Sequence, residues 1–229
     1  MQGMGSAQKF WTLLSRGEQE TLAGLGLPKH YQPHAIICLQ DDPATHVFIL
    51  QAGWVKVLSA TKDGHEIVLA LRGDGDLVGE IAGEVSGRRN ATIQAIGKVR
   101  ALIVPHDRFS LFLDANSGAN HAYRRAVTQK FDDTNTMLRS WAGTSGRQRL
   151  AGLLLDLAEQ HGRAVNDAIH LAMPLSQEEL ASMAGTSRAT LTRAYANWRQ
   201  RRLIRTGQRW ITIIDPPGLR QVAGRPRVG

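Results

Sequence analysis

Hydrophobic and polar positions change their period along the first half of the chain. Apolar side chains recur at helical spacing between residues 8 and 25, which predicts a short helical segment there. From about Tyr31 the period becomes two, and short apolar runs such as 46–50, 54–58 and 66–71 are separated by turn sequences. Many short strands at this spacing predict an antiparallel β-barrel or jelly roll rather than alternating strands and helices.

Beyond Pro105 a helical pattern takes over, and its longest stretch runs from about Asn120 to Trp141. Five positions on it are spaced four, three, four and three residues apart, as in a heptad seam: Val127, Phe131, Thr134, Leu138 and Trp141. Such a seam is typical of a helix that pairs with a second copy of itself. A seam this short also fits a helix that packs on its own domain, so the pattern leaves both interpretations open.

Residues 143–146 mark a hinge, and a second domain is expected to follow it. Ser176 and Glu179 have the spacing of a capping box, which opens one helix. Gly185 ends that helix, and Ser187 is placed to cap the next one. Two helices joined by a tight glycine turn form a helix-turn-helix.

The second helix of this pair, from Arg188 to about Arg201, has two distinct faces. One apolar stripe is expected to be core: Leu191, Ala194, Tyr195 and Trp198. The opposite face carries small, polar and basic residues: Ala189, Thr192, Arg193, Ala196 and Gln200, with Arg188 at its N-terminal flank. Small residues permit close approach to a groove floor, and arginine donates to guanine or phosphate, so this helix predicts DNA recognition.

Further arginines continue into residues 203–213, where two short apolar runs flank the turn Thr206-Gly207. This pattern predicts two strands that form a wing, with Arg209 against the DNA backbone. The formal net charge of +8 indicates a polyanionic partner. Charge alone fits a membrane surface as well, but the adjoining capped helix pair favours nucleic acid.

Length and composition limit the classes that the chain can belong to. Its 229 residues suit one large or two modest domains, and a hydrophobic fraction of 42% is that of an ordinary globular protein. No apolar run approaches the roughly 20 residues that span a bilayer. The N-terminal residues lack a long apolar segment, so we expect no secretory signal. Cys38 is the single cysteine, which excludes an intramolecular disulfide and favours the cytoplasm.

Enzymatic and metal-dependent alternatives find little support in the chain. Residues 73–79 resemble a dinucleotide fingerprint superficially, but turn glycines explain them better. His30 and His34 are four residues apart in a strand-like segment with a proline between them, so we expect no metal site. One cysteine excludes an iron–sulfur cluster, while His65 or Cys38 remains open as a haem ligand. We therefore expect a protein that is not an enzyme.

The segment 175–204, LSQEELASMAGTSRATLTRAYANWRQRRLI, resembles the winged helix-turn-helix of the CRP/FNR (catabolite activator protein) family of bacterial transcription regulators. The resemblance extends over nearly the whole chain, in family order. It implies an α+β fold: an N-terminal β jelly roll of the cyclic-nucleotide-binding type, a long dimerisation helix and a C-terminal winged helix-turn-helix. The matching DNA-contact positions are Ser187, Arg188, Ala189 and Arg193. Ala189 departs from the cyclic-AMP-responsive members, which have a glutamate there.

The same resemblance implies an effector site in the jelly roll. The family's phosphate cassette is Gly-Glu-Leu followed by Arg-Ser/Thr-Ala, and the matching residues here are Gly79, Glu80, Ile81, Arg89, Asn90 and Ala91. The carboxylate suits a ribose hydroxyl and the guanidinium suits a cyclic phosphate. Asn90 stands in the hydroxyl position, and the Glu-to-Arg interval is one residue shorter than in the cyclic-AMP receptor. Without that gap in the match, Asn90 replaces the arginine itself.

Thr134 and Asn135 resemble the Thr-Ser pair that meets adenine across the family's dimer. The implied effector is cyclic AMP or a related cyclic nucleotide, and no metal is implied. Two alternatives stay open for this region. Thr134 is also a polar residue that sets the register of a seam, and the cassette is also a degenerate one in a regulator that needs no ligand or senses another effector.

The domains expected from these patterns are 1–116 (sensor), 117–143 (long helix and hinge), 144–215 (winged helix-turn-helix) and 216–229 (a basic flexible tail). The tail also resembles the Gly-Arg-Pro core of an AT-hook, although Ala223 replaces the usual leading arginine. The expected partners are a double-stranded DNA operator, a second copy of the chain through the 120–141 helix, and RNA polymerase as a candidate. The full set of residues expected at the DNA is Gln177, Thr186, Ser187, Arg188, Ala189, Thr192, Arg193 and Arg209.

Overall fold

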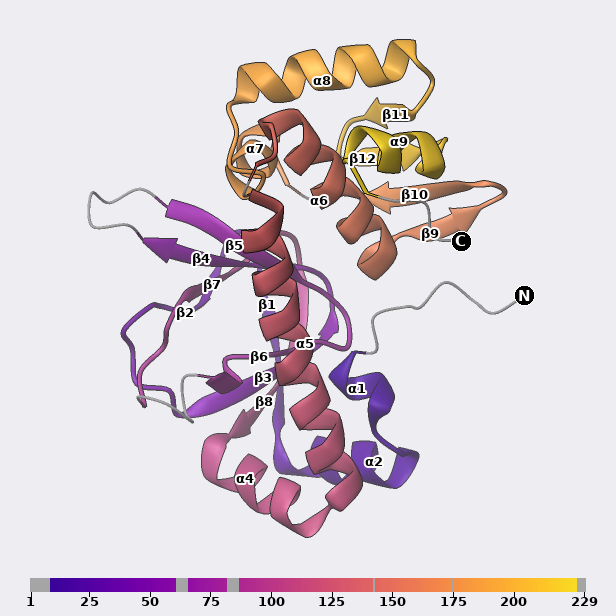
Figure 1. Cartoon of the computed structure of the whole chain (residues 1–229). Coiled ribbons are helices and arrows are strands. Elements are labelled where there is room, and N and C mark those ends of the chain that lie inside the picture. The colour runs from indigo at the N-terminus through magenta and orange to yellow at the C-terminus, as the bar shows by residue number, and fades with distance from the viewer. Residues whose placement is uncertain (1–8, 61–65, 82–86, 142, 174, 226–229) are drawn as a thin grey trace. The chain divides into compact units, whose positions relative to one another are not determined.

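A computed structural model describes residues 9–60, 66–81, 87–141, 143–173 and 175–225 of the chain (Figure 1). The side chains of 137–141 are outside this description. The chain divides into two compact units, one with residues 8–134 and the other with residues 135–229.

The first unit begins with two short helices, α1 (Phe10–Leu13) and α2 (Arg16–Leu25). The helical segment predicted for residues 8–25 is therefore confirmed, with a break between the two helices. The break has a local cause, because the Ser15 side chain accepts from the Glu18 amide while the Glu18 carboxylate accepts from the Ser15 amide. This capping box starts a new helix.

Eight strands follow, and every pair among them is antiparallel. Their bounds are β1 (Leu27–Tyr31), β2 (Ile36–Cys38), β3 (His46–Ala52), β4 (Val55–Ala60), β5 (Glu66–Arg72), β6 (Leu77–Val78), β7 (Thr92–Ala95) and β8 (Val99–Pro105). They form two four-stranded sheets, ordered β1-β8-β3-β6 and β2-β7-β4-β5. The predicted β jelly roll is confirmed.

Alternation along β3 divides the core of this unit into two parts. Phe48 and Leu50 belong to the cluster between the two sheets. Val47 and Ile49 point to the other face and pack with helices α1, α2 and α4 (His106–Ala115). Figure 1 shows these helices gathered at the same end of the unit as β3 and β8. Because successive side chains of a strand point to opposite faces, the buried strand β3 contributes residues to both parts of the core.

The long helix α5 (Ser117–Trp141) begins by packing on its own unit, where Ala119 and Ala122 are fully buried. Along the predicted seam Val127 is half-buried, whereas Phe131 is 60% exposed. The predicted long helix is confirmed. Its first turns pack on their own domain, which is one of the two interpretations that the sequence left open. Farther along the helix, Phe131 is not covered by the described residues of the chain.

The second unit consists of helices around a small sheet. Its elements are α6 (Gly146–His161), β9 (Arg163–Val165), β10 (Ala168–Ala172), α7 (Gln177–Met183), α8 (Arg188–Gln200), β11 (Ile204–Gly207), β12 (Trp210–Ile213) and α9 (Pro216–Val222). The strand order is β11-β12-β10-β9. The β11–β12 hairpin is the predicted wing. The β9–β10 hairpin was not predicted, although its turn residues Asn166-Asp167, with Asn166 at φ +54°, are typical of a tight hairpin.

The expectation of a flexible tail from residue 216 is wrong as far as Arg225. Asp215 caps α9 by accepting from the Gly218 amide, and Leu219 on that helix is fully buried. Beyond α9, the Arg225 guanidinium donates to both carboxylate oxygens of Asp156 on α6, at 2.5 and 2.8 Å. This carboxylate raises the pKa of Arg225 and engages the arginine that would be the centre of an AT-hook. Residues 226–229 lie outside the described residues.

Candidate functional site

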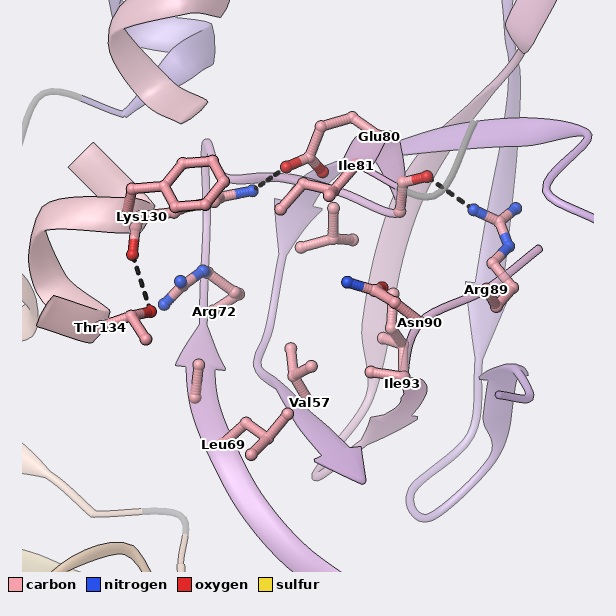
Figure 2. A pocket seen from close by; sticks show the side chains of 15 residues that line it. Val57, Leu69, Arg72, Glu80, Ile81, Arg89, Asn90, Ile93, Lys130 and Thr134 are labelled. Atoms are coloured by element: carbon pink, nitrogen blue, oxygen red, sulfur yellow. Dashed lines mark hydrogen bonds and ion pairs between the residues drawn. The ribbon is translucent and has the colours of Figure 1, made fainter. Parts of the chain in front are cut away.

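A pocket of about 300 Å³ opens in the first unit between the β5 edge of the jelly roll and α5 (Figure 2). Seven of the eight residues expected at the effector site line it: Gly79, Glu80, Ile81, Arg89, Asn90, Ala91 and Thr134. Asn135 is not among the lining residues and is assigned to the other unit. The cassette and the helix that the sequence analysis associated are thus brought together within one unit.

Glu80 is buried in this pocket with a basic partner. Its carboxylate is 2% exposed and accepts from the Lys130 ammonium on α5 at 2.6 Å. Lys130 also donates to the Leu77 carbonyl at 2.6 Å, so it joins α5 to the strand before the cassette. Sequence reasoning missed Lys130, although it lies one helical turn before Thr134, whose hydroxyl donates to the Lys130 carbonyl at 2.9 Å.

Arg89 is buried as well, and it binds backbone. Its guanidinium donates to the carbonyl oxygens of Gly79 and His46, each at 2.7 Å, and lies 5.2 Å from the ring centroid of Phe48. Nε has no hydrogen-bond partner among the described residues. Gly79 has a φ of +80°, and a Cβ there would lie 2.6 Å from the Arg89 Nη1 atom. Glycine is therefore required at this position for both conformation and space.

Arg72 is a second residue of the pocket that the sequence analysis did not identify. It ends β5, is half-buried, and donates through Nη1 to the neighbouring Leu71 carbonyl at 2.8 Å. Figure 2 shows its side chain on the side of the pocket formed by Lys130 and Thr134, with Asn90 between it and Arg89. The exposed Asn90 side chain lies at the pocket between two guanidinium groups.

The second unit contains the predicted helix-turn-helix in α7 and α8. Ser176 and Glu179 form the capping box at the start of α7, and Gly185 in the turn has a φ of +56°. The Ser187 hydroxyl accepts from the Thr190 amide at 3.1 Å and so caps α8. These local signals are confirmed, and they set the angle at which α8 leaves α7.

The two faces of α8 are those predicted. The stripe expected to be core is buried: Leu191, Ala194, Tyr195 and Trp198. This burial raises the pKa of the Tyr195 hydroxyl. Of the eight residues expected at the DNA, Thr186 is half-buried. The other seven are exposed: Gln177, Ser187, Arg188, Ala189, Thr192, Arg193 and Arg209.

Arg188 forms an ion pair with Glu178 at 2.8 Å, and the two side chains are 65% and 69% exposed. An ion pair this open contributes about 0–1 kcal/mol, so it leaves the guanidinium available to a phosphate. The one hydrogen bond that Arg193 forms with the described part of the chain runs from Nε to the Ala189 carbonyl of its own helix, at 3.3 Å. The exposed face of α8 therefore presents two cations around small side chains, as contact with a DNA groove requires.

The alternatives to this site gain little from the structure. Residues 73–76 form a tight turn, with the Gly73 amide bonded to the Asp76 carboxylate at 2.7 Å. His30 and His34 are both exposed, and the described residues include no group of three or more potential metal ligands. Cys38 is half-buried, which raises its thiol pKa, and His65 lies outside the described residues. No described helix is both long and apolar enough to cross a bilayer.

A jelly roll with a charged pocket and a winged helix-turn-helix in the same chain together define a class of one-chain transcription regulators. Comparison with known families agrees with this class. The model of the cyclic nucleotide-binding domain matches residues 28–116, and the model of the Crp-like helix-turn-helix domain matches residues 148–222. The chain belongs to the CRP/FNR family of transcription regulators.

Curated relatives are transcription regulators and not enzymes. The chain is 28% identical over 202 residues to the CRP-like cAMP-activated global transcriptional regulator of Mycobacterium tuberculosis, covering 86% of this chain and 90% of the relative. It is 24% identical to the global nitrogen regulator of Nostoc sp. over 188 residues, 81% of this chain and 84% of the relative. Among solved structures, FixK2 from Bradyrhizobium japonicum has a TM-score of 0.75 at 18% identity, over 89% of this chain and 99% of that one, which supports the fold.

Proposed function

We propose that the protein is a homodimeric, sequence-specific DNA-binding regulator of the cytoplasm whose DNA affinity is controlled by a cyclic purine nucleotide, cyclic AMP or a close relative. The observation that carries the proposal is the convergence of Glu80, Arg89, Asn90 and Thr134 on one pocket. A cyclic nucleotide requires a cation and polar donors for its phosphate and an acceptor for its ribose hydroxyl. This pocket contains all three kinds of group.

The DNA-binding part of the proposal rests on the exposed face of α8. A two-fold dimer presents two such helices to sites about 34 Å apart, one turn of DNA, so the operator is expected to be a pseudo-palindrome. Arg193→Ala is expected to cost about 1–3 kcal/mol on the cognate operator if the guanidinium reads a base. Fluorescence anisotropy on operator and random duplexes measures this cost. An equal loss on both duplexes assigns Arg193 to phosphate, and unchanged affinity removes it from the interface.

Dimer formation is proposed through α5. Phe131, 60% exposed in the single chain, lies on the predicted seam, and a second copy of the helix would cover it. Light scattering on the purified protein should give the mass of a dimer, and Phe131→Glu should give that of a monomer. A dimer that survives this substitution would place the interface elsewhere. The exposed Leu111 on α4 offers a matched control, because Leu111→Glu changes an apolar surface residue away from the seam.

The effector is tested by calorimetric titration of the full chain with cyclic AMP and cyclic GMP. Arg89 is a poor probe of ligand contact, because its buried bonds to two backbone carbonyls make Arg89→Ala a test of folding as well. Asn90 is exposed, so Asn90→Asp changes charge at the phosphate end without removing a buried contact. We expect Asn90→Asp to lower nucleotide affinity at least tenfold by repulsion, and Asn90→Ala to lower it less. No heat with either nucleotide at millimolar concentration would reject a nucleotide effector.

A second candidate function is a regulator of the same type that senses another effector or none. It is favoured by one specific observation: the Glu80 carboxylate already has a partner within the chain, the Lys130 ammonium at 2.6 Å. A ribose hydroxyl that donates to Glu80 has to share the carboxylate with Lys130 or displace the Lys130 ammonium. If the protein gives no nucleotide heat but binds its operator tightly in anisotropy experiments, this second candidate replaces the first. RNA polymerase is the further partner expected of an activator, and transcription in a purified system tests it.

A further inference from the structure

Arg72 is a cation placed in a largely apolar wall of the effector pocket. It follows Leu69 and Ala70 on β5, and Val57 on β4 and Ile93 on β7 of the same sheet line the same pocket. Its one described hydrogen bond goes to the adjacent Leu71 carbonyl, and it has no acidic partner among the described residues. A guanidinium has five N–H donors, so most of the donors of this half-buried group lack a described protein acceptor.

The other charged residues of the pocket already form described bonds, although Nε of Arg89 has no partner among the described residues. Lys130 pairs with Glu80, and Arg89 donates to two backbone carbonyls. Arg72 is therefore the pocket cation with most to gain from a ligand. A half-buried donor that gains an acceptor recovers the free energy lost when it left water, so a ligand with a suitable acceptor binds more tightly than one without.

The position of Arg72 decides which part of a nucleotide it would meet. Figure 2 shows it with Thr134 on the α5 side of the pocket, while Arg89 lies on the other side of Asn90. This inference rests on the proposed function, in which the cyclic phosphate lies at the cassette. The purine of such a ligand then extends toward Arg72 and Thr134. The Thr134 hydroxyl donates to the Lys130 carbonyl, so its oxygen is left to accept from the base.

We propose that Arg72 is a specificity-determining residue that selects a purine with two adjacent acceptors, the O6 and N7 atoms of guanine, over adenine. Guanine presents both acceptors to a guanidinium fork, whereas adenine presents N7 next to an amino group that donates. A donor facing a donor leaves both unpaired. A good bidentate contact discriminates by roughly tenfold or more, so cyclic GMP is the expected preferred ligand of the two common cyclic purine nucleotides.

The test is calorimetric titration of the full chain with cyclic GMP, cyclic AMP and cyclic IMP. Cyclic IMP retains O6 and N7 but lacks the 2-amino group of guanine, so it isolates the edge that Arg72 is proposed to bind. We expect cyclic GMP and cyclic IMP to bind similarly and cyclic AMP about tenfold more weakly. Arg72→Met keeps an apolar stem of similar length and is expected to remove this preference by weakening the first two ligands. Arg100→Met changes an exposed arginine on β8 outside this pocket and should leave all three affinities unchanged.

The possible outcomes separate this inference from the function on which it rests. If none of the three nucleotides binds to the natural protein, the nucleotide effector and the role of Arg72 are both rejected. If cyclic AMP binds as tightly as cyclic GMP, the role of Arg72 is rejected while the effector proposal stands. If Arg72→Met weakens all three ligands by the same factor, Arg72 acts on the shared phosphate and not on the base. Thermal melting of each variant shows whether an affinity change reflects ligand contact or loss of folding.

Discussion

Replacing Lys130 by methionine removes the partner of a buried carboxylate. Glu80 is 2% exposed and Lys130 is 17% exposed, and the 2.6 Å ion pair joins the cassette to α5. Methionine keeps most of the side-chain volume but leaves the Glu80 charge uncompensated in the protein interior. Removing one partner of a buried pair costs about 3–5 kcal/mol, and the variant also loses the bond from Lys130 to the Leu77 carbonyl. We therefore expect the first unit to lose about 3 kcal/mol or more of stability.

The measurement has to report the stability of the first unit alone. Hydrogen exchange of the buried amides in β3 does so, because this strand is paired on both sides with β8 and β6. Lys98→Met, at an exposed position, is the control for loss of a lysine and should change protection little. The double variant Glu80→Gln/Lys130→Met removes the unpaired charge and is expected to recover at least half of the loss. A cost below about 1 kcal/mol, or no recovery in the double variant, would refute the buried-pair argument.

Two further predictions concern conformation and the C-terminal segment. Gly79→Ala forces a Cβ to 2.6 Å from the Arg89 Nη1 atom at a φ of +80° and should lower stability by about 1–3 kcal/mol in thermal melting. Gly87→Ala, at a φ of +66° with no atom within 4 Å of its Cβ, isolates the conformational part of that cost, and equal losses would disprove the clash. Asp156→Asn weakens the ion pair with Arg225 and should speed hydrogen exchange in α9, while unchanged exchange would show that this ion pair does not stabilise the helix.

The elements predicted correctly are those whose signals are local. The capping pairs at Ser176 and Ser187 and the glycine between their helices lie within a dozen residues, so the sequence alone identifies the helix-turn-helix. The prediction of a flexible tail from residue 216 was wrong, although the signals for a helix there are also local. Prolines at the first helical positions are compatible with a helix, and here Asp215 caps that helix and Leu219 is buried.

The charges of the pocket could be predicted only in part. The cassette pattern located Glu80 and Arg89, but it did not reveal what each binds in the folded chain. Lys130 lies fifty positions from Glu80, and their contact depends on how α5 crosses the jelly roll, which no local pattern specifies. Arg72 was missed for a similar reason, because an arginine at the end of a strand is usually exposed to solvent. Only the tertiary structure places it in the pocket.

The bonds of Arg89 also bear on which positions can drift during evolution. Both acceptors, at Gly79 and His46, are main-chain carbonyl oxygens, which every amino acid provides. Substitution of His46 changes a side chain whose one described hydrogen bond goes to the adjacent Thr45 hydroxyl, while the carbonyl stays in place because β3 is held by β8. Position 46 can therefore vary without loss of the anchor, whereas position 79 cannot. Homologous chains should retain both the glycine at position 79 and the arginine at position 89, and they should show many different residues at position 46.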